Sequence, residues 1–297
     1  MPFPRKDYAI ITKVGRIATS EFNYGTAWVQ KSVQRSLVRL NTSYLDVVYC
    51  HDVEFVSPAE VLTAVTELRR IRDVEGALKY VGISGYPVSV LCSLAEFILE
   101  ETGEPLDCVM SYANFTLQNR RLETEGLDRL QATGVGVVLN ASILGMGLLR
   151  RDGIPIGGAG DWHPAPDGLR QACRAASDYC HHRGERIETV AIGWALETWL
   201  SVGGRVGSRG SLAQGLTEEV GGQKLGVSVM GVSSVEELDE TARVWQSVLD
   251  RFKQGTAQTE GWGNLATGVW QTLGEWQDFA WASPGEDYVR VRMTTDE

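Results

Sequence analysis

Lys13 and His51 are the side chains of this sequence best placed to do acid–base chemistry. Each ends a short apolar run typical of a buried β-strand, at residues 8–13 and 45–51. A β/α barrel carries its catalytic groups at the carboxyl ends of its parallel strands. We therefore expect an ammonium and an imidazole to face one pocket, the first as a fixed cation and the second as a titratable hydrogen-bond donor.

Strand-like and helix-like segments alternate along the chain. Between the apolar runs, residues such as Val29, Val33 and Leu37 recur at helical spacing, and Ser57–Pro58 has the form of a helix N-cap followed by proline. Such alternation predicts a parallel sheet covered by helices, here an α/β fold of the (β/α)8 TIM-barrel type. No glycine-rich fingerprint follows the first strand, which disfavours a Rossmann fold. The predicted strands lie near residues 8–14, 45–51, 79–84, 106–112, 135–141 and 226–231.

The composition narrows the classes of partner. A net charge of −10 over 297 residues disfavours nucleic acid and anionic membranes. No apolar stretch approaches the roughly 20 residues of a membrane span, and the amino-terminal residues lack a signal-peptide core. The five cysteines are scattered without metal-ligand spacing, so we expect free thiols, no bound metal and a cytoplasmic protein.

Two segments interrupt the alternation. Residues 202–224 are rich in glycine and serine and read as a flexible insertion within a barrel spanning residues 1–250. Residues 251–297 form a C-terminal extension with Trp262, Trp270, Trp276 and Trp281. Because such rings favour burial, we expect this extension to pack on the barrel.

Six motifs in order carry a resemblance to a known family. They are residues 11–16 (ITKVGR), 32–40 (SVQRSLVRL), 44–52 (YLDVVYCHD), 80–85 (YVGISG), 140–149 (NASILGMGLL) and 162–166 (WHPAP). With them the chain resembles the aldo-keto reductases, in the branch containing L-galactose dehydrogenase and fungal D-arabinose dehydrogenase.

The resemblance implies a barrel that binds NAD or NADP and transfers hydride between the nicotinamide and a sugar hemiacetal or another carbonyl or alcohol. In this family an Asp, a Tyr, a Lys and a His serve the reacting oxygen. Lys13 matches the Lys and His51 matches the His. A tyrosine hydroxyl has an ordinary pKa of about 10, so it needs a neighbouring cation to exchange its proton near neutrality.

The resemblance also implies positions for cofactor and substrate. NADP-preferring members place cations in the turn where this chain has Gly231, Glu236 and Glu237, which favours NAD over NADP. Expected substrate-side residues are Tyr49, two positions before His51, Tyr24 and His163. The positions expected to contact the cofactor are Ser84, Tyr112, Asn140, Ser142, Leu144, Gly231 and Glu240.

The family Asp and Tyr lie before the Lys, whereas no Asp-x-x-x-Tyr precedes Lys13. We therefore expect an incomplete barrel that lacks the first two strands. Two functions remain open. The chain is an aldo-keto reductase type oxidoreductase, or it is a non-redox enzyme or a non-catalytic, partner-dependent protein. Unpaired sheet edges also predict self-association.

Overall fold

The computed structural model describes residues 4–208, 224–254 and 262–291. Their main sheet has six parallel strands in the order β1-β4-β5-β6-β7-β8. The α/β fold with an incomplete barrel is thus confirmed, as are all six predicted strands. The strands are β1 (Ile11–Val14), β4 (Leu45–His51), β5 (Leu78–Gly85), β6 (Cys108–Tyr112), β7 (Val137–Ala141) and β8 (Val227–Val229).

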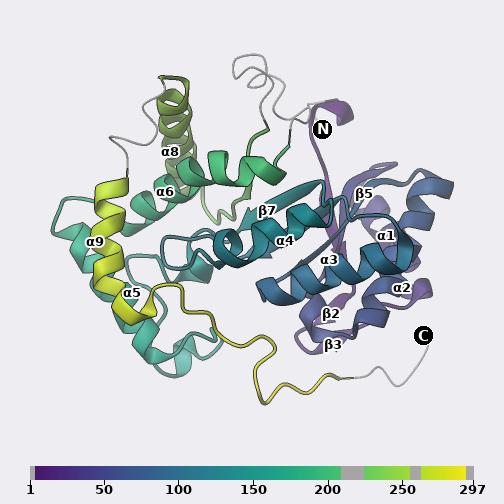
Figure 1. The fold of residues 1–297 in the computed structure, drawn as a ribbon, viewed down its shortest axis with the longest axis horizontal. Coiled ribbons are helices and arrows are strands. Elements are labelled where there is room, and N and C mark those ends of the chain that lie inside the picture. Colours follow the sequence, from purple (N-terminus) through teal and green to yellow (C-terminus); the bar gives the residue numbers. More distant parts are fainter. Residues whose placement is uncertain (1–3, 209–223, 255–261, 292–297) are drawn as a thin grey trace.

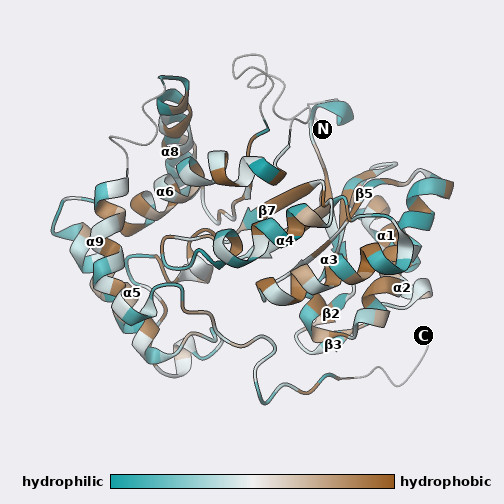
Figure 2. Ribbon diagram, viewed as in Figure 1, coloured by the Kyte–Doolittle hydropathy of each residue, from teal (hydrophilic) through white to brown (hydrophobic). Residues whose placement is uncertain are grey.

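Helices cover the outer face of this sheet (Figure 1). Alternate strand residues such as Val48, Cys50 and Ile83 are fully buried against them in the main hydrophobic core. In Figure 2 the first helices carry both hydrophobic and hydrophilic residues, as expected for helices with one buried face. These helices are α1 (Thr26–Leu40), α2 (Pro58–Arg70), α3 (Val88–Thr102) and α4 (Leu127–Ala132).

Local signals explain where helices begin and end. The Ser57 side chain accepts from the Glu60 N–H and the Glu60 carboxylate accepts from the Ser57 N–H, which is a capping box with Pro58 in the first turn. This confirms the predicted N-cap. Helix α3 ends at Gly103, whose φ of 68° is readily adopted by glycine.

A short antiparallel pair was not predicted from the sequence. Strands β2 (Arg16–Ala18) and β3 (Glu21–Phe22) form a separate two-stranded sheet directly after β1, with an irregular register between Arg16 and Ala18. Their alternation extends over only three and two residues. A strand is recognised in sequence by alternation over roughly four to eight residues, and these two strands are shorter than that.

The second half of the chain adds a group of helices beside the sheet (Figure 1). Helix α6 is apolar on every side because α5, α8 and α9 all pack on it. Of the expected flexible insertion, residues 209–223 lie outside the described residues. These helices are α5 (Asp167–His181), α6 (Ile187–Val202), α8 (Val235–Gln254) and α9 (Gly263–Leu273).

The C-terminal strap, defined as residues 274–291, leaves α9 and runs back to the amino-terminal half of the molecule (Figure 1). At its start, Gln118 Nε2 donates to the carbonyl of Trp276 at 2.8 Å. At its end, the Val291 N–H donates to the Ser20 carbonyl at 2.8 Å, beside β3. The strap therefore connects the two halves of the described chain.

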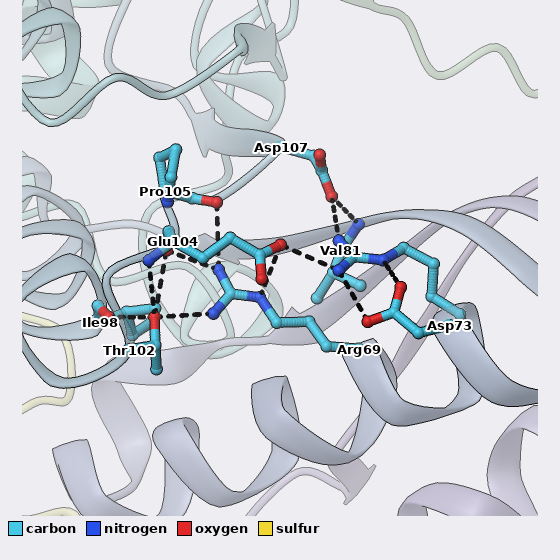
Figure 3. Close-up of polar contacts among 9 residues, drawn as sticks. Arg69, Asp73, Val81, Ile98, Thr102, Glu104, Pro105 and Asp107 are labelled. Atoms are coloured by element: carbon cyan, nitrogen blue, oxygen red, sulfur yellow. Dashed lines mark hydrogen bonds and ion pairs between the residues drawn. The ribbon is translucent and has the colours of Figure 1, made fainter.

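A charged network closes the amino-terminal edge of the sheet (Figure 3). The Arg69 guanidinium donates to Thr102 Oγ1 at 2.8 Å and to the Glu104 carbonyl at 2.8 Å, which ties α2 to the end of α3. Asp107 Oδ2 accepts from the Val81 N–H at 2.8 Å and so joins β5 to the start of β6. These hydrogen bonds and the Arg69–Glu104 ion pair hold the strands and helices together at this end of the sheet.

Candidate active site

Lys13 and His51 lie on neighbouring strands and on one face of the sheet. Lys13 pairs in register with Tyr49, and His51 pairs with Ser84. Since side chains alternate between faces along a strand, all four residues face the inner side, away from the helices. Lys13 is exposed and His51 is half-buried. The sheet thus brings the two predicted catalytic groups to one edge.

Burial and nearby charges set the state of His51. The pKa of His51 is lowered to about 4, mainly because burial removes solvent from the imidazole. The cations of Lys13 and Arg16 lower the pKa further, whereas the Asp52 carboxylate raises it. His51 Nε2 lies 3.4 Å from Asp52 Oδ1. The imidazole is therefore neutral near pH 7 and able to donate a hydrogen bond without carrying charge.

Asp52 and Arg16 are site residues that the sequence interpretation missed. Asp52 is 2% exposed and has a left-handed backbone with φ of 57°. Its N–H donates to the Ser84 carbonyl at 2.8 Å, and its carboxylate forms an ion pair with Arg16. The available signal was the acidic residue directly after His51. This pair holds the end of β4 against β5 and β2.

Tyr24 supports the site from the core. Its side chain is 1% exposed, and its hydroxyl donates to the His51 carbonyl at 2.6 Å. Burial is the main reason that the pKa of Tyr24 is raised well above its ordinary value. The structure thus places this predicted substrate-side residue under the strand end, where it fixes the backbone of His51.

Tyr49 lies on the inner face, fully buried in a small cluster with Cys108, Met110 and Leu139. A cavity of about 1050 Å³ reaches this ring from the amino-terminal half of the strands, where Lys79 also lines it. The cavity thus opens toward the edge opposite His51. Lys13, His51 and Ser84 do not line it, so this cavity is a space separate from the candidate site.

Ser84 and Tyr112 occupy the carboxyl ends of β5 and β6. Ser84 Oγ donates to the Cys50 carbonyl at a long 3.4 Å, and Ser84 is 1% exposed. Tyr112 pairs with Ala141 and is half-buried, and burial raises its pKa, with a smaller contribution from Glu54. Both lie on the face that carries His51.

Three residues predicted to contact the cofactor lie on β7 or in the loop after it. By register Asn140 faces the helices, where its Nδ2 donates to the Phe115 carbonyl at 2.9 Å while its buried Oδ1 has no partner in the described ranges. Ser142 follows in a left-handed conformation with φ of 54°, and its carbonyl accepts from the Gly145 N–H. Leu144 is half-buried in the same loop.

Gly231 and Glu240 mark the turn from β8 into α8. Gly231 is exposed, and a Cβ there would meet nothing within 4 Å. Glu240 lies in the second turn of α8 and accepts from Arg186 at 2.9 Å and from Thr189 at 2.8 Å. Its carboxylate therefore fastens α8 to α6.

His163 is buried beside the loop that follows β7. Its Nδ1 accepts from the Ala165 N–H at 3.0 Å, and its Nε2 lies 3.3 Å from the Gly145 carbonyl. The Trp281 ring of the C-terminal strap packs edge-on against it, with centroids 5.0 Å apart. Both ring nitrogens are thus engaged by the protein's own backbone.

Within the described residues, no helix has the length and apolar character needed to cross a membrane. The same stretches contain no group of three or more His, Cys, Asp or Glu side chains able to hold a metal ion.

Comparisons with known proteins agree with this architecture. D-arabinose 1-dehydrogenase of Saccharomyces cerevisiae is 38% identical over 238 residues, which is 80% of this chain and 62% of that protein. L-galactose dehydrogenase of Arabidopsis thaliana is 33% identical over 194 residues, covering 65% of this chain and 57% of that protein. The chain therefore spans about three fifths of the length of these curated relatives.

An aldo-keto reductase of Bacillus halodurans, solved in its holo form, has the same fold with a TM-score of 0.52. It is 18% identical and covers 86% of this chain and 73% of its own. The model of the aldo/keto reductase family matches residues 1–254, which is most of the sequence. This chain belongs to the aldo/keto reductase family.

Proposed function

We propose that this chain serves NAD(P)-dependent hydride transfer between a nicotinamide and a sugar hemiacetal or another carbonyl or alcohol. The observation that carries the proposal is the placement of Lys13 beside His51 on the inner face, at the carboxyl ends of β1 and β4. The names of the two sugar dehydrogenases among the relatives support this substrate class.

The two groups suit a reacting oxygen. A neutral His51 donates a hydrogen bond to that oxygen and orients it, because its low pKa keeps the imidazole uncharged. The Lys13 ammonium stabilises negative charge on the same oxygen or on a hydroxyl that exchanges a proton with it. Asp52, Arg16 and Tyr24 hold the end of β4 so that His51 keeps its position.

One observation fits a dinucleotide: the open space at Gly231 leaves room for a ligand at the turn after β8. Asn140, a cofactor position by resemblance, instead faces the helices, where its buried Oδ1 has no partner among the described residues. Ser84, Tyr112, Ser142 and Leu144 would hold other parts of the dinucleotide. When bound, the nicotinamide supplies or accepts the hydride.

NAD is the cofactor that we favour. The turn after β8 leads to Glu237, whose carboxylate already accepts from Arg150 at 2.8 Å, and to Glu240, which accepts from Arg186. A 2′-phosphate needs unneutralised cationic donors, and both of these arginines already face carboxylates. We further propose a cytoplasmic protein whose partner is a small molecule, in keeping with a net charge of −10.

Cofactor titration of the 297-residue chain tests the proposal. We expect NADH to bind, as read by fluorescence, and to bind more tightly than NADPH. Formation of NADH from NAD with D-arabinose or L-galactose then tests the substrate class. Failure of both cofactors to bind at millimolar concentration would refute the proposal and leave the non-redox or partner-dependent alternative.

Gly231→Lys is the matched variant for cofactor choice. The open space at Gly231 accommodates the added side chain. An exposed ion pair to a 2′-phosphate is worth roughly 1 kcal/mol at most, so the preference for NADH over NADPH is expected to fall by up to about fivefold. An unchanged preference would place the adenosine end of the cofactor elsewhere.

A further inference from the structure

Glu54 is a half-buried residue whose carboxylate the proposed chemistry does not use. It lies in a short 3-10 turn, Val53–Phe55, directly after the end of β4. Its Oε1 accepts from the Tyr86 N–H at 3.0 Å and from Ser283 Oγ at 3.1 Å. One carboxyl oxygen therefore joins the end of β5 to the C-terminal strap.

The second oxygen of Glu54 is held in a tight space. Oε2 is buried and has no hydrogen-bond partner in the described part of the chain. A Cβ on Gly85 would lie 2.4 Å from it, so any other residue at position 85 would displace the carboxyl group. The absence of a side chain at Gly85 therefore leaves room for Glu54 Oε2, which accepts no hydrogen bond from the described residues.

Beyond this carboxyl group the strap packs on aromatic side chains at the carboxyl ends of β5 and β6. The Trp281 ring stacks on the Tyr86 ring with centroids 4.5 Å apart and an interplanar angle of 5°. The Trp281 N–H donates to the Tyr86 hydroxyl at 3.3 Å. Tyr86 in turn packs against Tyr112, at 5.4 Å between centroids, at the end of β6. Ser283, which Glu54 holds, lies two residues after the Trp281 ring of this aromatic stack.

Several groups bear on the charge of Glu54. The pKa of Glu54 is raised to about 7, mainly by burial and to a smaller extent by the Asp52 charge. The hydrogen bonds from Tyr86 and Ser283 lower it. Tyr24 and Tyr112 face it from neighbouring elements, and the Glu54 charge raises the pKa of each. Arg16, the nearby cation, is paired with Asp52.

We infer that Glu54 is a positioning residue that fastens the C-terminal strap at the carboxyl ends of β5 and β6, and that its proton controls the fastening. Its consequence for catalysis rests on the proposed function, whereas the fastening itself does not. When the strap lifts, water reaches the carboxyl group and removes the main cause of its raised pKa. The closed form therefore binds a proton that the open form releases.

Closure of the strap is expected to weaken as pH rises. A carboxyl group whose pKa is higher in the closed form favours closure at low pH and loses that effect as pH rises through the closed-form value. With a closed-form pKa of about 7 against an ordinary 4.5, the closure constant falls by about tenfold between roughly pH 6 and pH 8.

Hydrogen exchange on the full chain tests this inference, with exchange times scaled to the intrinsic rate at each pH. In the wild type, protection of residues 278–288 is expected to fall by about tenfold between roughly pH 6 and pH 8. Glu54→Gln keeps the shape and the acceptor oxygen but cannot ionise, so its protection is expected to stay level.

Ser283→Ala is the matched control. It removes the hydroxyl that donates to Glu54, so protection is expected to be lower at every pH while the slope remains. A level profile in the wild type, a retained slope in Glu54→Gln, or full protection in Ser283→Ala would each overturn the inference. Since no cofactor or turnover is involved, these outcomes are separate from a failure of the proposed function.

Discussion

At the residue scale, Lys13 adds to the low pKa of His51, of which burial is the main cause. The Lys13 ammonium is one of the causes that lower the pKa of His51 to about 4. We expect Lys13→Met to raise that pKa toward its ordinary value and Lys13→Arg to leave it low, because only the first removes the positive charge. Titration of the His51 imidazole by NMR measures both.

The same shift has a consequence for stability. The unfolded chain protonates this histidine near its ordinary pKa of 6.5, whereas the folded protein does so near 4. Stability is therefore lost as pH falls between these values. A His51 resonance that titrates near 6.5 in the folded wild type would contradict the burial that the site requires.

Residue types at strand ends revealed Lys13 and His51, because a buried strand ends where its apolar run stops. Glu54, Asp52 and Arg16 could not be found that way. Their roles depend on the left-handed turn at Asp52, which returns the chain over β5, and no local pattern specifies such a turn. The outward orientation of Asn140 depends on register, which is fixed only once β6 and β7 pair.

At the scale of elements, Asp46 holds three strands together at the amino-terminal edge. Its Oδ2 accepts from the Ile10 N–H at 2.8 Å and from Arg5 at 2.6 Å, and its Oδ1 accepts from Lys79 at 2.9 Å. Burial alone would raise the pKa of Asp46, but these bonds outweigh it and lower the pKa. The carboxylate therefore stabilises the sheet.

Asp46→Asn is expected to lower the free energy of unfolding by about 1–3 kcal/mol at neutral pH, the usual range for hydrogen bonds to a charged group. Because the pKa of Asp46 is lowered on folding, the loss should shrink as pH falls through its folded value. Urea unfolding at several pH values measures this. Asp73→Asn is the matched control, since Asp73 is exposed and, among the described residues, forms its ion pair with Arg72 alone. An equal effect of both substitutions would contradict the assigned role.

The six strands were predictable because each is a nearly continuous apolar run, which is the pattern of strands buried on both faces. The β2–β3 pair was not, since its few residues show no periodicity that stands out from a loop. The packing partners of α6 could not be predicted either, because too many of its residues are apolar. Its apolar residues fall on all sides, and the sequence gives no single face to assign to a partner.

At the scale of the whole molecule, the sheet is open within the described residues, with β1 and β8 as its edge strands. Self-association through these edges stays a prediction. The two halves of the molecule are joined by the segment after α8, which the clustered tryptophans marked in the sequence as a packed extension. Their docking sites could not be foreseen, because two of them are glycines on distant helices, Gly168 beneath Trp276 and Gly193 beneath Trp262.

Gly193→Ala tests how this extension is attached. In an isolated helix the change would stabilise α6 by up to about 1 kcal/mol. Here the new methyl group would lie 2.1 Å from Trp262 Nε1, so the indole must move and α9 with it. We expect the free energy of unfolding to fall by about 1–3 kcal/mol, typical of overpacking, together with faster proteolysis within residues 262–291.

Gly263→Ala is the control, since a Cβ there meets nothing within 4 Å. Wild-type stability and protease resistance in Gly193→Ala would show that the extension is held by other contacts, such as the bond from Trp270 Nε1 to the Leu117 carbonyl at 2.9 Å.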